Sequence, residues 1–162
     1  MHITSSTLHG KDAQNGRIKA VTKKANNNLV IQLENPISPV LTEKETPGQG
    51  VEIAVMTRNI KIVGQDDGTY NGGYLQVFHT PGVAQIIDGV EFFNMGQMSR
   101  KNRFAMQLLY NGNVKGTSLS FNSIRKSNMR CISVDGTATA TIASNVGSEI
   151  TGHCFYFDRV AA

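Results

Sequence analysis

The feature that most constrains the fold of this 162-residue chain is a short pattern that occurs twice. Residues 130–137 read RCISVDGT and residues 153–160 read HCFYFDRV, so a cysteine, two alternating apolar residues and an aspartate return 23 positions later. Alternation of apolar and polar residues indicates a β-strand with one face toward a core. Because the pattern recurs, we expect the two segments to be equivalent strands on neighbouring turns of a repeat fold.

Other alternating runs fall into three sets that recur in the same order along the chain. The sets are Leu75/Val77, Met106/Leu108, Ile132/Val134 and Phe155/Phe157; then Ile60, Val90, Ile124 and Val146; and then Ile86, Leu119 and Ile142. Three short strands per turn, with insertions confined to the connections, predict an all-β right-handed parallel β-helix. The alternative is an antiparallel β-sandwich, whose short strands give a similar local signal.

The first 50 residues differ in texture from the rest of the chain. They are polar and rich in turns, and strands are expected at 16–23 and 27–35. We therefore expect an N-terminal β segment at 1–50 that packs on or caps the solenoid, and β-helix coils at 51–162. The last coil would leave an edge that solenoids normally cap, so we expect the chain to be truncated at its C-terminus.

The formal net charge is +4, and its distribution is uneven. Residues 92–134 contain no Asp or Glu but hold Arg100, Lys101, Arg103, Lys115, Arg125, Lys126 and Arg130. A stretch of one sign favours an anionic partner. No nucleic acid is expected, because no recognition motif accompanies the charge. The sequence shows no signal peptide and no apolar run that could span a bilayer, so no membrane contact is expected of this segment.

The two cysteines, Cys131 and Cys154, occupy equivalent positions of the repeated pattern. Strands one coil apart bring Cα atoms within the range of a disulfide, but ladders of free thiols also occur, and the unbonded pair is the preferred interpretation. Neither cysteine has an evident base beside it, so a catalytic thiol is not expected. Metal-site spacings are missing, so no metal site and no cofactor are expected, with calcium left open.

Five stretches resemble, in content, order and spacing, the β-helix region of the cell-surface and secreted hyaluronidase family related to fibrocystin. They are VEIAVMTRNIKIVG, VAQIIDGVEFFNMGQ, RFAMQLLYNGN, NSIRKSNMRCISVDGT and SNVGSEITGHCFYFD. The resemblance implies a right-handed parallel β-helix in a large extracellular or membrane-anchored protein. It also implies that some members bind or cleave hyaluronan, whereas fibrocystin-like members are receptor-like proteins without clear catalysis.

The chain departs from this family on one face of the expected coils. The histidines that relatives tend to carry there are replaced by Gln107, Leu109, Arg125, Lys126 and Asp135, and only His153 remains. The resemblance therefore supports the β-helix fold more strongly than it supports the catalytic chemistry of the family.

Alternation places three columns on the outside of the expected coils. They are Ala105/Cys131/Cys154, Gln107/Ser133/Tyr156 and Leu109/Asp135/Asp158. Asp135 and Asp158 would lie about 5 Å apart, the separation of a retaining glycosidase pair. Two like charges so close would raise the pKa of one of them, as a general acid requires. The preferred interpretation is simpler, because Asp-Gly and Asp-Arg also end strands.

Arg103 and Arg130 precede their strands by similar offsets, so we expect them side by side. With Arg125, Lys126, Arg100 and Lys101 they would form a basic patch. Guanidinium groups bind carboxylates bidentately, which suits polymers of uronic acids. The adjoining outer face would add the ligand-binding side chains Gln107, Ser133 and Tyr156, with the tyrosine ring stacked on a sugar.

Three functions remain open at this point. The preferred one is a β-helix segment of a larger extracellular or cell-surface protein that binds an anionic, hyaluronan-like polysaccharide. The second is a glycan-cleaving, hyaluronidase-like domain with Asp135, Asp158 and His153 as its acids and bases, which the missing histidines disfavour. The third is a non-catalytic architectural spacer of a fibrocystin-like ectodomain.

Overall fold

A computed structural model describes residues 1–4, 12–38 and 51–159 of the chain. Contacts between residues divide the chain into two compact units, Met1–Val55 and Met56–Ala162. Every regular element of the described residues is a β-strand, so the prediction of an all-β chain is confirmed. The two units are described separately below.

The first unit contains two small antiparallel sheets. Strand β1 (His2–Ile3) lies between β2 (Gln14–Asn15) and β5 (Ile53–Ala54). Strands β3 (Ile18–Lys23) and β4 (Leu29–Leu33) form a hairpin, which confirms the two strands expected from the sequence.

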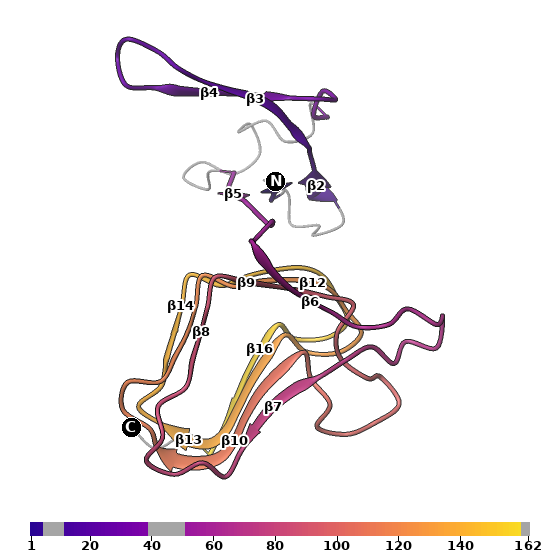
Figure 1. Ribbon diagram of the computed structural model, residues 1–162. Coiled ribbons are helices and arrows are strands. Elements are labelled where there is room, and N and C mark those ends of the chain that lie inside the picture. Colours follow the sequence, from indigo (N-terminus) through magenta and orange to yellow (C-terminus); the bar gives the residue numbers. More distant parts are fainter. Residues whose placement is uncertain (5–11, 39–50, 160–162) are drawn as a thin grey trace. The chain divides into compact units, whose positions relative to one another are not determined.

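The second unit consists of three parallel sheets that the chain visits in rotation (Figure 1). The β6–β15 sheet contains β6 (Ile60–Val63), β9 (Val90–Phe93), β12 (Ser123–Ser127) and β15 (Val146–Ile150). The β7–β16 sheet contains β7 (Leu75–Phe78), β10 (Met106–Asn113), β13 (Ile132–Ala138) and β16 (Phe155–Asp158). The β8–β14 sheet contains β8 (Ile86–Asp88), β11 (Ser118–Ser120) and β14 (Thr141–Ala143).

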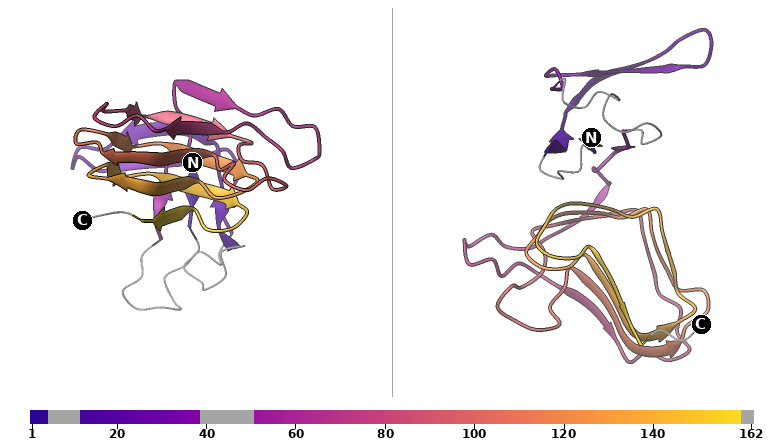
Figure 2. Two further views of the ribbon diagram at one scale, coloured as in Figure 1. Left: turned by 90° about the horizontal axis from the view of Figure 1, so that it is seen from below. Right: turned by 180° about the vertical axis from the view of Figure 1, so that it is seen from behind.

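Successive coils of this unit therefore stack strand on strand, as Figure 2 shows from the side. We number the coils by the strands of the β7–β16 sheet, so that coil 1 contains β7 and coil 4 contains β16. Parallel pairing excludes the antiparallel sandwich, since each strand pairs with its counterpart one coil away. The repeated sequence pattern has the expected cause, because Ile132 pairs with Phe155 and Val134 with Phe157.

The predicted register is right in the β7–β16 sheet and partly wrong in the other two. Ile60 pairs with Val90 as expected, but Ile124 pairs with Phe92 and Gly147 instead of Val90 and Val146. In the β8–β14 sheet, Leu119 pairs with Ile87 and not with its neighbour Ile86. These errors have one cause. The prediction aligned one apolar residue of each strand, whereas the residue that faces the core at the aligned position is a glycine or a second apolar residue nearby.

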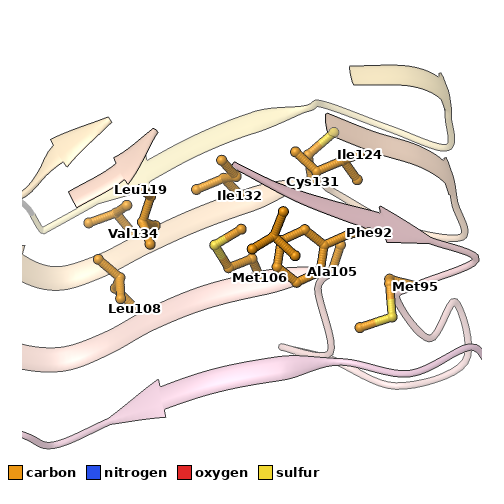
Figure 3. Close-up of a cluster of buried hydrophobic side chains, with 11 residues drawn as sticks. Phe92, Met95, Ala105, Met106, Leu108, Leu119, Ile124, Cys131, Ile132 and Val134 are labelled. Carbon is orange, nitrogen blue, oxygen red and sulfur yellow. The ribbon is translucent and has the colours of Figure 1, made fainter. Parts of the chain in front are cut away.

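The core fills the inside of the coils with residues from all three sheets. Figure 3 shows its buried side chains, in which Phe92, Leu119 and Ile124 meet the inward residues of the β7–β16 sheet. A single coil cannot enclose such side chains, so their burial depends on the stacking of neighbours about 4.8 Å apart.

A disulfide joins Cys131 to Cys154, with Cα atoms 4.4 Å apart. The preferred free-thiol pair is therefore wrong, and so is the outward column of Ala105, Cys131 and Cys154. Ala105 and Cys131 are fully buried in the core, because the backbone turns just before β13 and the amides of both Cys131 and Ile132 donate to the carbonyl of Cys154. A Cβ on Gly147 would lie 2.3 Å from the Cys154 sulfur, so this glycine makes room for the bridge.

The corners of the coils repeat as regularly as the strands. In the β7–β16 sheet, a positive φ occurs directly after the last residue of each strand that pairs in continuous register. The four residues with this φ are His79, Tyr110, Gly136 and Arg159. Another corner is held by the side chains of two asparagines, one buried and one half-buried. The Asn122 amide side chain accepts from Val90 N and donates to Ile87 O, and Asn145 repeats this with Asn122 N and Leu119 O. These contacts satisfy backbone groups where the sheets end.

Candidate functional site

The centre of the outer face of the β7–β16 sheet is closed to ligands. Gln76, Gln107, Ser133 and Tyr156 form the expected outward column across the four coils. However, Gln107 is 2% exposed and Ser133 is 0% exposed, and the Gln107 side-chain oxygen accepts a 2.7 Å hydrogen bond from Gln76. Gln107 and Ser133 therefore offer a ligand almost no accessible surface.

Arginines and tyrosines line the edge of this sheet where its strands begin. The Arg103 guanidinium lies 4.1 Å from the ring centre of Tyr74, which belongs to the preceding coil. Arg130 lies 3.8 Å from the Tyr156 ring on the next coil and 5.2 Å from that of Phe104 on the preceding one. We call these five residues the strand-start edge. Its arginines occupy neighbouring coils, as the sequence predicted.

The positive charge of the strand-start edge is not neutralised within the described residues. No described carboxylate forms an ion pair with Arg103 or Arg130. Guanidinium donors lie in the plane of the group, so stacking on a ring fixes the plane and leaves the N–H groups free for a carboxylate. Arg130 lies over one face of the Tyr156 ring, and the stacking of this ring on a sugar stays a prediction.

The other two predicted basic residues lie elsewhere and already have acidic partners. Arg125 and Lys126 belong to β12, on the β6–β15 sheet. Arg125 lies 3.7 Å from the buried Glu91 carboxylate, which also pairs with Lys61 at 3.2 Å. Lys126 pairs with Asp66 at 3.7 Å. The predicted patch of six basic residues is thus divided. Two of them have acidic partners, and the other four, Arg100, Lys101, Arg103 and Arg130, form no ion pair with a described carboxylate.

At the opposite edge of the β7–β16 sheet, where its strands end, an arginine has an acidic partner. Arg159 donates to both carboxylate oxygens of Asp135, at 2.8 and 2.5 Å, and to the Tyr110 hydroxyl at 2.9 Å. The hydrogen bonds to Asp135 and to Tyr110 both raise the pKa of Arg159, and the bond to Asp135 has the larger effect. A Cβ on Gly136 would lie 2.7 Å from the Tyr110 ring, so this glycine lets the ring cross the intervening coil. We call Tyr110, Asp135, Gly136 and Arg159 the strand-end edge.

The three catalytic candidates are not brought together. Asp135 and Asp158 are paired residues on neighbouring strands, as predicted, but Arg159 occupies the Asp135 carboxylate. His153 precedes β16 whereas Asp158 ends it, so the two are separated by roughly 16 Å of extended chain. A general acid and base must both reach one reacting centre, which this separation prevents.

Sequence reasoning missed a polar cavity beside the strand-start edge. Its volume is about 400 Å³, and its walls are Asp67, Thr69, Asn71, Tyr74, Gln97, Ser99, Arg100 and Arg103. The walls come from the connections at 64–74 and 94–105, whereas the equivalent connections of later coils are only 128–131 and 151–154. This difference in length between equivalent connections is a signal in the sequence, since insertions in repeat folds gather on the binding face.

In the described part of the chain, no group of three or more His, Cys, Asp or Glu side chains is arranged to bind a metal ion. Within the same residues, no helix has the length and hydropathy needed to cross a membrane.

Comparison with known proteins gives relatives along most of the chain. A G8 domain-containing protein of Dictyostelium discoideum is 29% identical over 164 residues, which cover 96% of this chain and 11% of the relative. Communication mutant protein F of the same organism is 26% identical over 107 residues, covering 66% of this chain and 10% of the relative. A cell surface hyaluronidase of Danio rerio is 28% identical over 124 residues, covering 65% and 9%. No solved structure matches the chain.

The chain thus spans about a tenth of the length of these relatives. The model of the CEMIP β-helix family matches residues 70–159, which include both edges of the β7–β16 sheet and the 94–105 wall of the cavity. This match confirms the resemblance to the hyaluronidase-related β-helix region and agrees with the parallel sheets of the second unit. The chain belongs to the CEMIP β-helix family.

Proposed function

We propose that this β-helix domain binds an anionic, hyaluronan-like polysaccharide at its strand-start edge. The single observation that supports this most is that Arg103 and Arg130 stack on tyrosine rings in neighbouring coils and pair with no described carboxylate. Two ring-supported guanidiniums on neighbouring coils, whose backbones lie about 5 Å apart, suit a polymer that carries carboxylates along its length. Arg100 and Lys101, both exposed on the neighbouring connection, add charge that attracts such a polymer.

The domain acts outside the cell or at its surface, as part of a larger polypeptide with right-handed coils. The disulfide supports this location, because such bonds persist in oxidising compartments and are rare in the cytosol. The relatives named G8 domain-containing protein and cell surface hyaluronidase support it as well. Parallel strands joined by crossover connections favour the right hand.

Binding is favoured over cleavage because the described residues place no pair of acids at this edge. Asp135 is held by Arg159 at the other edge of the sheet, and His153 lies far from Asp158 along β16. The tyrosines support arginines and carry no acid–base chemistry in this account.

The experiment is a titration of the domain with hyaluronan oligosaccharides at low salt. The double variant Arg103→Ala/Arg130→Ala is expected to bind at least about 100-fold more weakly, since each lost charged contact costs about ten-fold. The matched control Lys115→Ala/Lys126→Ala removes the same charge at other corners and should change the affinity little. Equal losses in both double variants, or no binding by the unmodified domain, would refute the proposal.

A further inference from the structure

The cavity beside the strand-start edge is built by two long connections at one corner of the coils. Residues 64–74 join β6 to β7 and residues 94–105 join β9 to β10, and both project from the same corner in Figure 1 and in the rear view of Figure 2. We call them the paired loops. Coils 3 and 4 have only the short connections 128–131 and 151–154 at this place. The paired loops are therefore additions to the coil and not part of its repeat.

The paired loops are held to each other in a fixed arrangement. Asn71 and Gln97 form an antiparallel bridge, and the Gln97 side chain donates to Gly72 O at 3.0 Å. The Ser99 hydroxyl donates to the Asn71 side-chain oxygen at 2.6 Å. The loops also approach so closely that a Cβ on Gly72 would lie 1.9 Å from Asn94 O. Such a cavity is formed before a ligand arrives, which lowers the entropic cost of binding.

The walls of the cavity carry charges of both signs beside neutral hydrogen-bonding groups. Arg100 and Arg103 contribute two positive charges, and Asp67 contributes one negative charge. Asp67 forms no ion pair with either arginine, nor with any other described residue. Instead its carboxylate accepts from the Thr69 amide at 2.9 Å and from the Thr69 hydroxyl at 2.5 Å. Both hydrogen bonds lower the pKa of Asp67, and the one from the Thr69 hydroxyl has the larger effect. The carboxyl group is therefore charged at neutral pH.

We propose that the cavity between the paired loops is a specificity subsite for an unsulfated uronate-containing unit, and that Asp67 excludes sulfated ones. This inference rests on the proposed function. The arginines bind one planar carboxylate, and the amide and hydroxyl side chains of Asn71, Gln97 and Ser99 bind sugar hydroxyls or amides. A sulfate on the same unit would place a second negative charge in a cavity that already holds Asp67. Discrimination then comes from a repulsive contact built against the wrong ligand.

The test compares two probes that differ in sulfate alone, oligosaccharides of unsulfated chondroitin and of chondroitin sulfate of equal length. The unmodified domain should bind the unsulfated probe more tightly. The Asp67→Asn variant should gain about five-fold in affinity for the sulfated probe and change little toward the unsulfated one. Asp67→Ser, which keeps an oxygen acceptor for Thr69, is a second variant that should behave in the same way.

Asp66→Asn is the matched control. It removes the same charge from the adjacent residue, whose carboxylate pairs with Lys126 and does not line this cavity. The control should leave the preference between the two probes unchanged. If the unmodified domain binds neither these probes nor hyaluronan oligosaccharides, the proposed function fails and this inference with it. If it binds but the Asp67 variants keep the preference of the unmodified domain, only this inference fails.

Discussion

The two edges of the β7–β16 sheet contain the same kinds of residue and differ in one partner. At each edge an arginine lies over a tyrosine ring of another coil. Where the strands begin, Arg103 and Arg130 each reach a tyrosine of a neighbouring coil, and where the strands end, Arg159 reaches Tyr110 two coils away. Arg159 is also bound by Asp135, whereas the arginines of the strand-start edge have no described carboxylate.

The difference teaches that stacking alone does not tell whether an arginine is structural or available for a ligand. At the strand-end edge, Asp135 neutralises Arg159, and the contacts of Arg159 with Asp135 and Tyr110 connect coils 2, 3 and 4. The strand-start edge keeps its guanidiniums oriented but uncompensated, beside a cavity that also holds Arg100. The comparison predicts that changes at one edge affect stability and changes at the other affect binding.

The largest expected effect follows from removing the disulfide, which supports the strand-start edge from inside the core. The bond closes a loop with a sequence separation of 23, so the double variant Cys131→Ala/Cys154→Ala should lose about 3 kcal/mol of unfolding free energy. Chemical denaturation of both proteins measures this. A variant as stable as the unmodified domain would mean that stacking alone fixes coils 3 and 4.

A smaller loss is expected from Gly136→Ala at the strand-end edge. Gly136 has a φ of +58°, and the added methyl group would meet the Tyr110 ring. We expect a loss of about 1–3 kcal/mol from backbone strain and the displaced ring. Denaturation gives the number, and titration with hyaluronan oligosaccharides should give an unchanged affinity. A large loss of binding would show that the two edges are coupled.

Arg125→Ala extends the comparison to a second arginine that has an acidic partner. Its partner Glu91 is 3% exposed and keeps Lys61 and the Arg58 backbone amide as partners, so a loss of about 1–2 kcal/mol is expected after allowing for solvent screening. Melting temperatures of Arg125→Ala and Arg103→Ala test this difference, since Arg103→Ala should be as stable as the unmodified domain. Equal melting temperatures for the two variants would contradict it.

The coils could be predicted because the repeated apolar pattern, the strongest signal in the sequence, consists of the residues whose stacking forms the coils. Residues 23 apart, such as Ile132 and Phe155, are direct neighbours in the β7–β16 sheet. The signal was weaker where the core required an unexpected residue. Gly147 faces the core because the disulfide occupies the space of a side chain, and a search for apolar residues passes over it. The asparagines at the corners have no apolar period and were missed for the same reason.

The site was predicted in part for a related reason. Offsets from the strands correctly placed Arg103 and Arg130 on neighbouring coils, since strand register determines those positions. Alternation does not say which outward side chains stay accessible, so it included the buried Gln107 and Ser133. The partners Glu91 and Asp66 of Arg125 and Lys126 depend on contacts distant in sequence, as does the cavity between the paired loops.

The most direct test of the account exchanges one arginine at each edge and measures both properties of each variant. Arg130→Gln should bind hyaluronan oligosaccharides about ten-fold more weakly and keep its melting temperature. Arg159→Gln should keep its affinity and melt at a lower temperature, because Asp135 and Tyr110 lose their partner. If both variants lose binding equally, or if Arg130→Gln alone is destabilised, the division of labour between the two edges is wrong.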